Sequence, residues 1–217
     1  MSPTIILVHG LWMTGIEMTM LRHRLQTDYG FACVQFSYAS VTGSMTDHVR
    51  KLRELAQAQQ CEQLHFVGHS LGGVVAYKML EATHDLIPGR AVFMGSPLQG
   101  SSAVSAITRW TLGRVAVGEE VREELLDGQP RHWDGRRDIG IIAGSVNMGF
   151  GRLFSDELTT NSDGMVTIEE TKLDGAKDHL VLPVTHTTMV FSPTATAQVA
   201  HFLRDGKFDH SMKEAEG

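Results

Sequence analysis

The sequence predicts an α/β fold in which a mostly parallel sheet of about six strands is flanked by helices. Short runs rich in β-branched residues alternate along the chain with longer segments of helical periodicity. Several of these short runs are apolar throughout, as expected of strands that helices cover on both faces. The length of 217 residues suits a single domain over 1–217.

The predicted elements follow one another in a regular strand–helix order. The expected strands are Thr4–Val8, Phe31–Phe36, Leu64–Val67, Ala91–Met94, Ile139–Ala143 and His179–Leu182. The expected helices are Glu17–Tyr29, Ser44–Gln59, Leu71–Ala82, Glu119–Leu126 and Ala195–Leu203. The second of these helices has the clearest pattern, because Val49, Leu52 and Ala56 recur at helical spacing with charges on the opposite face.

One interval, 97–137, breaks this rhythm between the fourth and fifth strands. It contains the predicted helix over 119–126 and an apolar patch around Trp110. An ordinary crossover helix with a long loop would explain the segment. A small lid insert over a pocket would explain it as well, and the sequence leaves both interpretations open.

Composition and charge argue for some classes of protein and partner and against others. Hydrophobic residues make up 42% and charged residues 20% of the chain, which is typical of a globular protein. The net charge of −6 argues against nucleic acid or an anionic membrane as the main partner. Cys33 and Cys61 provide no disulfide framework. With no secretory signal and no bilayer-spanning segment visible, we expect a cytoplasmic protein of undetermined oligomeric state.

The stretch Gly68-His69-Ser70-Leu71-Gly72 matches the pattern G-x-S-x-G between a predicted strand and a predicted helix. In this setting glycines allow strand and helix to approach closely, and the serine is held on a strained turn with its hydroxyl exposed. The start of the helix contributes unpaired N–H groups and a positive dipole. Ser70 is therefore the expected nucleophile.

A serine hydroxyl needs a base to take its proton. Among the 11 histidines, His186 stands in a loop just past the last predicted strand, where it can reach the same sheet edge as Ser70. His179 lies within that strand and is the alternative. We expect His186 to be the base.

The imidazole in turn needs a carboxylate that fixes its tautomer. Asp163 lies in a turn-rich segment after the fifth strand, and Gly164 allows the chain to bend sharply there. Asp156 and Glu157 compete for this role but suit solvated positions. The chain order Ser70, Asp163, His186 is the one that this sheet architecture uses.

The first predicted strand ends in His9-Gly10, where glycine lets the backbone come close to a substrate. The N–H groups of Leu11 and Leu71 would then form the oxyanion hole. A simple glycine turn after a strand is the alternative explanation.

With these motifs the chain resembles the α/β-hydrolase superfamily over nearly its whole length. The resemblance is carried by His9-Gly10, by G-H-S-L-G-G over 68–73, by S-D-G-M-V over 162–166 and by V-T-H over 184–186. The stretch MGSPLQGS over 94–101 is similar to a G-x-P-x-x-G-S segment of lipase-like members. Small bacterial lipases and inositol-deacylase-like esterases are the most similar in character. The resemblance implies acyl-ester hydrolysis through an acyl-enzyme, with no cofactor.

The chain also departs from the family pattern. The sequence begins almost directly with the predicted strand Thr4–Val8, which leads into His9-Gly10. We therefore expect no counterpart of the family's first two strands and a minimal sheet. Calcium-binding lipases of this type carry an aspartate just after the catalytic histidine. Thr187 and Thr188 occupy those positions, so no metal ligand is expected.

We therefore expect a serine esterase or lipase-like enzyme that acts on a small-molecule or lipid-like ester. Trp12, Met13 and Met148 are expected in the substrate pocket, because they lie in loops at the catalytic edge without an obvious core role. A small insert should favour acyl chains of about four to eight carbons, the reach over which buried methylenes add affinity. An acyltransferase or thioesterase, or a catalytically idle binding protein of this fold, remains the alternative.

Overall fold

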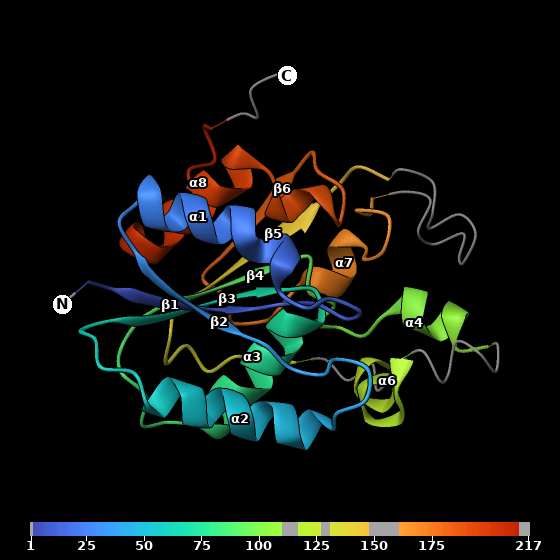
Figure 1. The fold of residues 1–217 in the computed structure, drawn as a ribbon. Helices are drawn as coiled ribbons and strands as arrows, with labels where there is room; N and C mark the ends of the chain where they lie inside the picture. The colour runs from blue at the N-terminus through green and yellow to red at the C-terminus, as the bar shows by residue number, and fades with distance from the viewer. Residues whose placement is uncertain (1, 110–116, 127–130, 148–160, 213–217) are drawn as a thin grey trace.

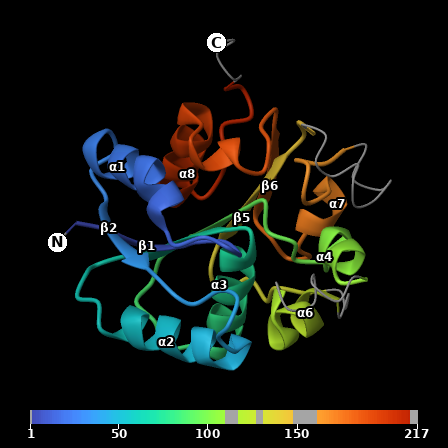
Figure 2. The ribbon, with the colours of Figure 1, turned by 45° about the vertical axis from the view of Figure 1, so that its right-hand side comes forward.

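A computed structural model describes residues 2–109, 117–126, 131–147 and 161–212 (Figure 1). Its centre is a six-stranded sheet with the order β2-β1-β3-β4-β5-β6, in which every neighbouring pair is parallel. Figures 1 and 2 show helices on both faces of this sheet. The predicted α/β class, the parallel sheet and the number of strands are confirmed.

The strands lie close to their predicted positions. They are β1 (Thr4–Val8), β2 (Ala32–Phe36), β3 (Leu64–His69), β4 (Ala91–Met94), β5 (Ile139–Gly144) and β6 (Asp178–Leu182). β3 is two residues longer than predicted, because His69 continues the ladder opposite Met94. The extra residues carry the strand directly to Ser70.

The helices also follow the prediction, with additions. They are α1 (Thr19–Thr27), α2 (Met45–Gln57), α3 (Leu71–Ala82), α4 (Ser102–Ile107), α6 (Glu119–Leu126), α7 (Ile168–Thr171) and α8 (Pro193–Asp205), with 3-10 turns η1 (Ile16–Met18) and η4 (Thr188–Val190). The helix predicted over 17–29 is shorter and is preceded by η1, which begins after a left-handed Gly15. Ser44 is the N-cap of α2, where its hydroxyl accepts a bond from the Asp47 N–H.

The helices form two layers that bury separate cores. α1 and α8 cover one face of the sheet, and α2 and α3 cover the other (Figure 2). Along β1, Ile5 and Leu7 belong to the core beneath α1 and α8. Ile6 and Val8 belong to the opposite core. This two-sided burial explains why the central strands are apolar without alternation.

The parallel register places the carboxyl ends of all strands on one edge. The loops after β1, β3, β4, β5 and β6 therefore leave the sheet on the same side. α4, α6 and α7 gather at this edge in both views (Figures 1 and 2). Ligands of open α/β sheets bind at such an edge.

Cys33 and Cys61 are both free. Burial raises the pKa of the Cys33 thiol to about 12, which suits a packing residue rather than a nucleophile. Within the described residues, no helix combines the length and the apolar character needed to cross a bilayer.

Candidate active site

Ser70 occupies a strained turn between β3 and α3. Its φ of 55° and ψ of −127° lie in a region that residues with a Cβ rarely adopt. The Ser70 N–H donates to the Met94 carbonyl at 2.9 Å, which ties the turn to the end of β4. Strain of this kind persists where the surroundings hold it, and it is concentrated at functional sites.

The neighbouring glycines are needed for the close crossing of strand and helix. A Cβ at Gly68 would lie 2.5 Å from the Cα of Gly73. A Cβ at Gly72 would lie 2.1 Å from the carbonyl oxygen of Val8 in β1. Any side chain at either position would push α3 away from the sheet, so the elbow requires glycine there.

The structure brings His186 and Asp163 together. Nδ1 of His186 lies 2.7 Å from Oδ2 of Asp163, and both residues are buried. Because a carboxylate only accepts, Nδ1 carries the proton and donates it to Asp163. The other ring nitrogen, Nε2, is then left with the lone pair that a general base needs.

Asp163 is itself held by the turn that follows it. Its Oδ1 accepts hydrogen bonds from the N–H groups of Met165 at 3.0 Å and Val166 at 2.8 Å. Its carbonyl accepts the His186 N–H at 2.8 Å. These bonds fix the positions of the Asp163 carboxylate and of His186. The tight turn at Gly164 brings the Met165 and Val166 N–H groups to the carboxylate.

Two further glycines make room for this pair. A Cβ at Gly95, after β4, would lie 3.0 Å from Oδ2 of Asp163 and 3.2 Å from Nδ1 of His186. Gly95 also has a φ of 54°, which disfavours any other residue. A Cβ at Gly144, at the end of β5, would lie 2.7 Å from the Asp163 Cβ. The sequence interpretation did not assign these glycines to the site.

His69, which precedes Ser70 in the chain, forms a hydrogen bond with the backbone of His186. Its Nε2 lies 2.9 Å from the His186 carbonyl, so Nε2 carries a proton and donates it there. The two rings are 4.8 Å apart. Full burial, followed by the nearby His186, lowers the pKa of His69 to about 3, so the ring is neutral. No role was assigned to His69 from the sequence, and the structure shows that it connects the Ser70 turn with His186.

The turn after β1 is braced by Tyr38, which follows β2. The Tyr38 hydroxyl donates to the His9 carbonyl at 2.8 Å, and its ring stacks on the His9 ring at 4.4 Å. Nε2 of His9 accepts the Tyr38 N–H at 3.3 Å, so Nδ1 carries the proton and faces the Gly10 carbonyl at 2.9 Å. This brace holds the backbone that leads to Leu11.

Residues from these segments line one cavity of about 250 Å³. Ser70 and His186 both line it, together with the predicted oxyanion residues Leu11 and Leu71 and the predicted pocket residues Trp12 and Met13. Further lining residues include Pro97, Ser101, Ala103, Val104, Ile107, Leu125, Met165, Val166 and Thr187. The 97–137 segment therefore supplies one wall of the cavity.

Several sequence expectations lie elsewhere. Met148, Trp110, Asp156 and Glu157 lie outside the described residues. The alternative base His179 is placed in β6, where its Nε2 is 3.0 Å from the Thr171 hydroxyl rather than on the cavity wall. Among the described residues, no three His, Cys, Asp or Glu side chains are grouped as metal ligands.

A model of the alpha/beta hydrolase family matches residues 5–204. The chain belongs to this family. Solved structures of lipases and esterases share its fold. The lipase BlEst2 of Bacillus licheniformis, in mature form, is 18% identical, with a TM-score of 0.70 over 94% of this chain and 91% of that one. The metagenomic carboxyl esterase MGS0156 is 17% identical, with a TM-score of 0.67 over 87% of this chain and 65% of that one.

The carboxylesterase CesB of Bacillus subtilis is a more distant neighbour of this alpha/beta hydrolase. It is 14% identical, with a TM-score of 0.58 over 94% of this chain and 84% of that one. At such identities these likenesses concern the fold.

Part of the chain is also similar to two phosphate import ATP-binding proteins. The phosphate import ATP-binding protein PstB of Pyrococcus furiosus is 34% identical over 97 residues, which are 44% of this chain and 36% of that protein. The PstB protein of Thermococcus kodakarensis is 33% identical over 96 residues. The matched segment spans only about a third of these curated relatives, 36% of each.

Proposed function

We propose that this alpha/beta hydrolase cleaves carboxylic esters through an acyl-enzyme on Ser70. The observation that carries the proposal is that Ser70 and His186 line one cavity, with the buried Asp163 bonded to His186. Ser70 stands on a strained elbow, and His186 is held by the buried Asp163 with its Nε2 free to accept a proton. A nucleophile, a base and an orienting carboxylate are the groups that acyl transfer needs.

The reaction would proceed in two steps. Ser70 Oγ attacks the ester carbonyl while His186 Nε2 takes the hydroxyl proton, and the N–H groups of Leu11 and Leu71 bind the oxyanion. His186 then returns the proton to the departing alcohol as the acyl–oxygen bond breaks. Water next attacks the acyl group with His186 as the base, which releases the acid and restores Ser70.

The cavity suits a short or medium acyl chain. Its volume of about 250 Å³ lies below the range of pockets that hold drug-sized ligands, and most of its lining side chains are apolar. Trp12 and Met13 line it, as do Val104 and Ile107 of α4. The 97–137 segment would thus act as a small cover over the acyl group.

The test is the hydrolysis of p-nitrophenyl butyrate by Ser70→Ala. Loss of a triad nucleophile lowers turnover by several powers of ten, so we expect a fall of at least about a thousandfold. Ser105→Ala, an exposed serine on α4, is the control and should keep full activity. A folded Ser70→Ala protein that retains more than about a tenth of the wild-type turnover would exclude this nucleophile.

A further inference from the structure

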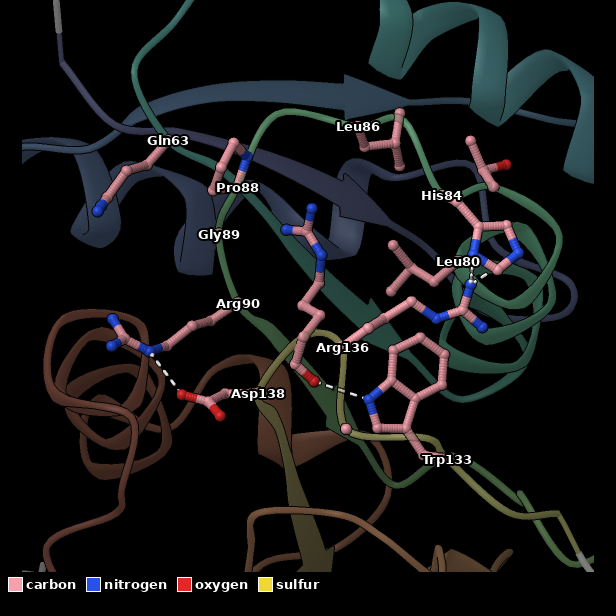
Figure 3. A pocket seen from close by; sticks show the side chains of 13 residues that line it. Gln63, Leu80, His84, Leu86, Pro88, Gly89, Arg90, Trp133, Arg136 and Asp138 are labelled. Carbon is pink, nitrogen blue, oxygen red and sulfur yellow. Dashed lines mark hydrogen bonds and ion pairs between the residues drawn. The ribbon is translucent and has the colours of Figure 1, made fainter.

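A second, larger cavity of about 460 Å³ opens at the other edge of the sheet (Figure 3). It lies where β3, β4 and β5 begin, and about 23 Å of extended chain along β3 separates its Gln63 from Ser70. Its lining residues include Arg90, Trp133, Arg136, Arg137 and Asp138. The proposed ester hydrolysis uses none of them.

Arg137 is a buried cation in the wall of this cavity. Its guanidinium donates to the carbonyls of Leu64 at 2.6 Å and Ile87 at 2.7 Å. Within the described residues no carboxylate forms an ion pair with it, and burial lowers the pKa of its side chain to about 10. Buried charges are ordinarily paired, because an uncompensated charge is costly away from water.

The other two arginines that line the cavity each form an ion pair with an aspartate. Arg90 Nε lies 3.3 Å from Asp138, and Arg136 Nε lies 2.9 Å from Asp134. Arginine side chains thus outnumber carboxylates in the lining, although the whole chain carries a net charge of −6. The local excess of positive charge is centred on Arg137 and is not explained by the overall composition.

The rest of the wall offers apolar surface beside these cations. Leu80, Leu86 and Pro88 line it, and the indole of Trp133 lies 4.9 Å beneath the Arg136 guanidinium. Figure 3 shows Arg136 and His84 turned toward each other at one end of the cavity. A ligand that fits would combine an anionic head with a small apolar or aromatic body.

We propose that this cavity binds a small organic anion, whose carboxylate or phosphate head meets Arg137 and Arg136. Two of the five N–H donors of Arg137 are used by the Leu64 and Ile87 carbonyls, which leaves others for a planar oxyanion. The bound anion supplies the countercharge that Arg137 lacks. The interaction is independent of catalysis at Ser70.

The experiment titrates the folded protein with phenyl phosphate, benzoate and benzyl alcohol, which share one ring and differ in the head group. The readout is the NMR signal of the Trp133 indole N–H, which donates to the Arg137 carbonyl at 2.7 Å and is assigned with Trp133→Phe. We expect a saturable shift with at least one of the two anions and none with the alcohol. The tighter anion identifies the head as phosphate or carboxylate.

Variants locate the binding. Arg136→Gln should weaken the anion about tenfold, the effect of losing one charge-assisted hydrogen bond. Arg137→Lys keeps the charge but loses the planar fork, and should weaken it at least as much. Arg50→Gln, at an exposed arginine on α2, is the matched control and should leave the affinity for the anion unchanged. If neither anion shifts the signal, if benzyl alcohol shifts it equally, or if folded Arg136→Gln binds as wild type, the proposal is wrong.

Discussion

Two histidine–aspartate pairs in the molecule have the same separation and very different surroundings. His186–Asp163 and His132–Asp174 are each 2.7 Å apart. The first pair is buried and its His186 lines the same cavity as Ser70, whereas the side chains of the second are 68% and 80% exposed. Water screens an exposed ion pair, which therefore contributes little to stability. The first pair differs from the second in its burial, in the backbone bonds that Asp163 accepts and in the cavity that His186 shares with Ser70.

These pairs give a matched test of the acid. Asp163→Asn should lower turnover by about 10³ or more, because an amide that donates to Nδ1 places the proton on Nε2, facing Ser70. Asp174→Asn makes the same chemical change at the exposed pair and should leave turnover unchanged. Steady-state kinetics with p-nitrophenyl butyrate decides. Equal effects of the two substitutions would remove Asp163 from the mechanism.

At this scale the sequence was most informative where a short motif carries the chemistry. Ser70, Asp163 and His186 were predicted from local patterns, and the structure brings the acid and base into contact. The contributions of His69 and Tyr38 could not be predicted in the same way. Each depends on a bond to a residue 29 or 117 positions away, and no local pattern records such a partner.

At the scale of elements, periodicity and capping explain which helices could be predicted. α2, α3 and α6 lie within or at their predicted bounds, because with 13, 12 and 8 residues each is long enough to show a recurring pattern of apolar residues. α4 and α7 are six and four residues long, too short for a periodic signal. Their N-caps, Ser101 and Thr167, hold them in place instead. Of these two short helices, α4 lines the cavity beside Ser70, with Ala103, Val104 and Ile107.

The position of α4 predicts the acyl preference. Specificity constants for p-nitrophenyl esters of two to sixteen carbons should peak at about four to eight, since each covered methylene contributes about 0.8 kcal/mol until the cavity is filled. Ile107→Trp fills part of the cavity and should move the peak to shorter chains. Leu126→Trp adds the same ring at an exposed position of α6 and should leave the peak in place. A preference that keeps rising to sixteen carbons would contradict the small cavity.

At the scale of the whole molecule, buried histidines couple folding to pH. Burial lowers the pKa of His65 to about 4 and that of His69 to about 3, from an ordinary value of 6.5. Below pH 6.5 the unfolded chain binds protons that the folded protein does not. The free energy of unfolding must therefore fall as the pH falls through this window.

Urea denaturation at pH 7, 6 and 5 measures this coupling. Each histidine should remove up to about 1.4 kcal/mol of stability per pH unit in this window. His69→Phe abolishes one of these titrations and should make the loss of stability between pH 6 and 5 visibly smaller than in wild type. The prediction fails if the protein gains stability on acidification, or if His69→Phe leaves the slope unchanged.

The overall architecture was predictable from the sequence. Alternating apolar strands and amphipathic helices predicted a parallel sheet, and the structure confirms it. The cationic cavity at the opposite edge was not predicted. Gln63, Arg90 and Arg137 come from separate loops, and only the packing of β3, β4 and β5 side by side brings them together.

The central claim is that Ser70 is an activated nucleophile. A fluorophosphonate probe measures this directly, because the serine oxygen bonds to phosphorus and fluoride leaves only where a base activates the hydroxyl. After incubation with the folded protein, mass spectrometry of the digested chain should find the adduct on Ser70. The adduct should form far more slowly in Asp163→Asn and be absent from urea-unfolded protein. A folded wild-type protein that stays unlabelled, or that carries the adduct on a different serine, would contradict the claim.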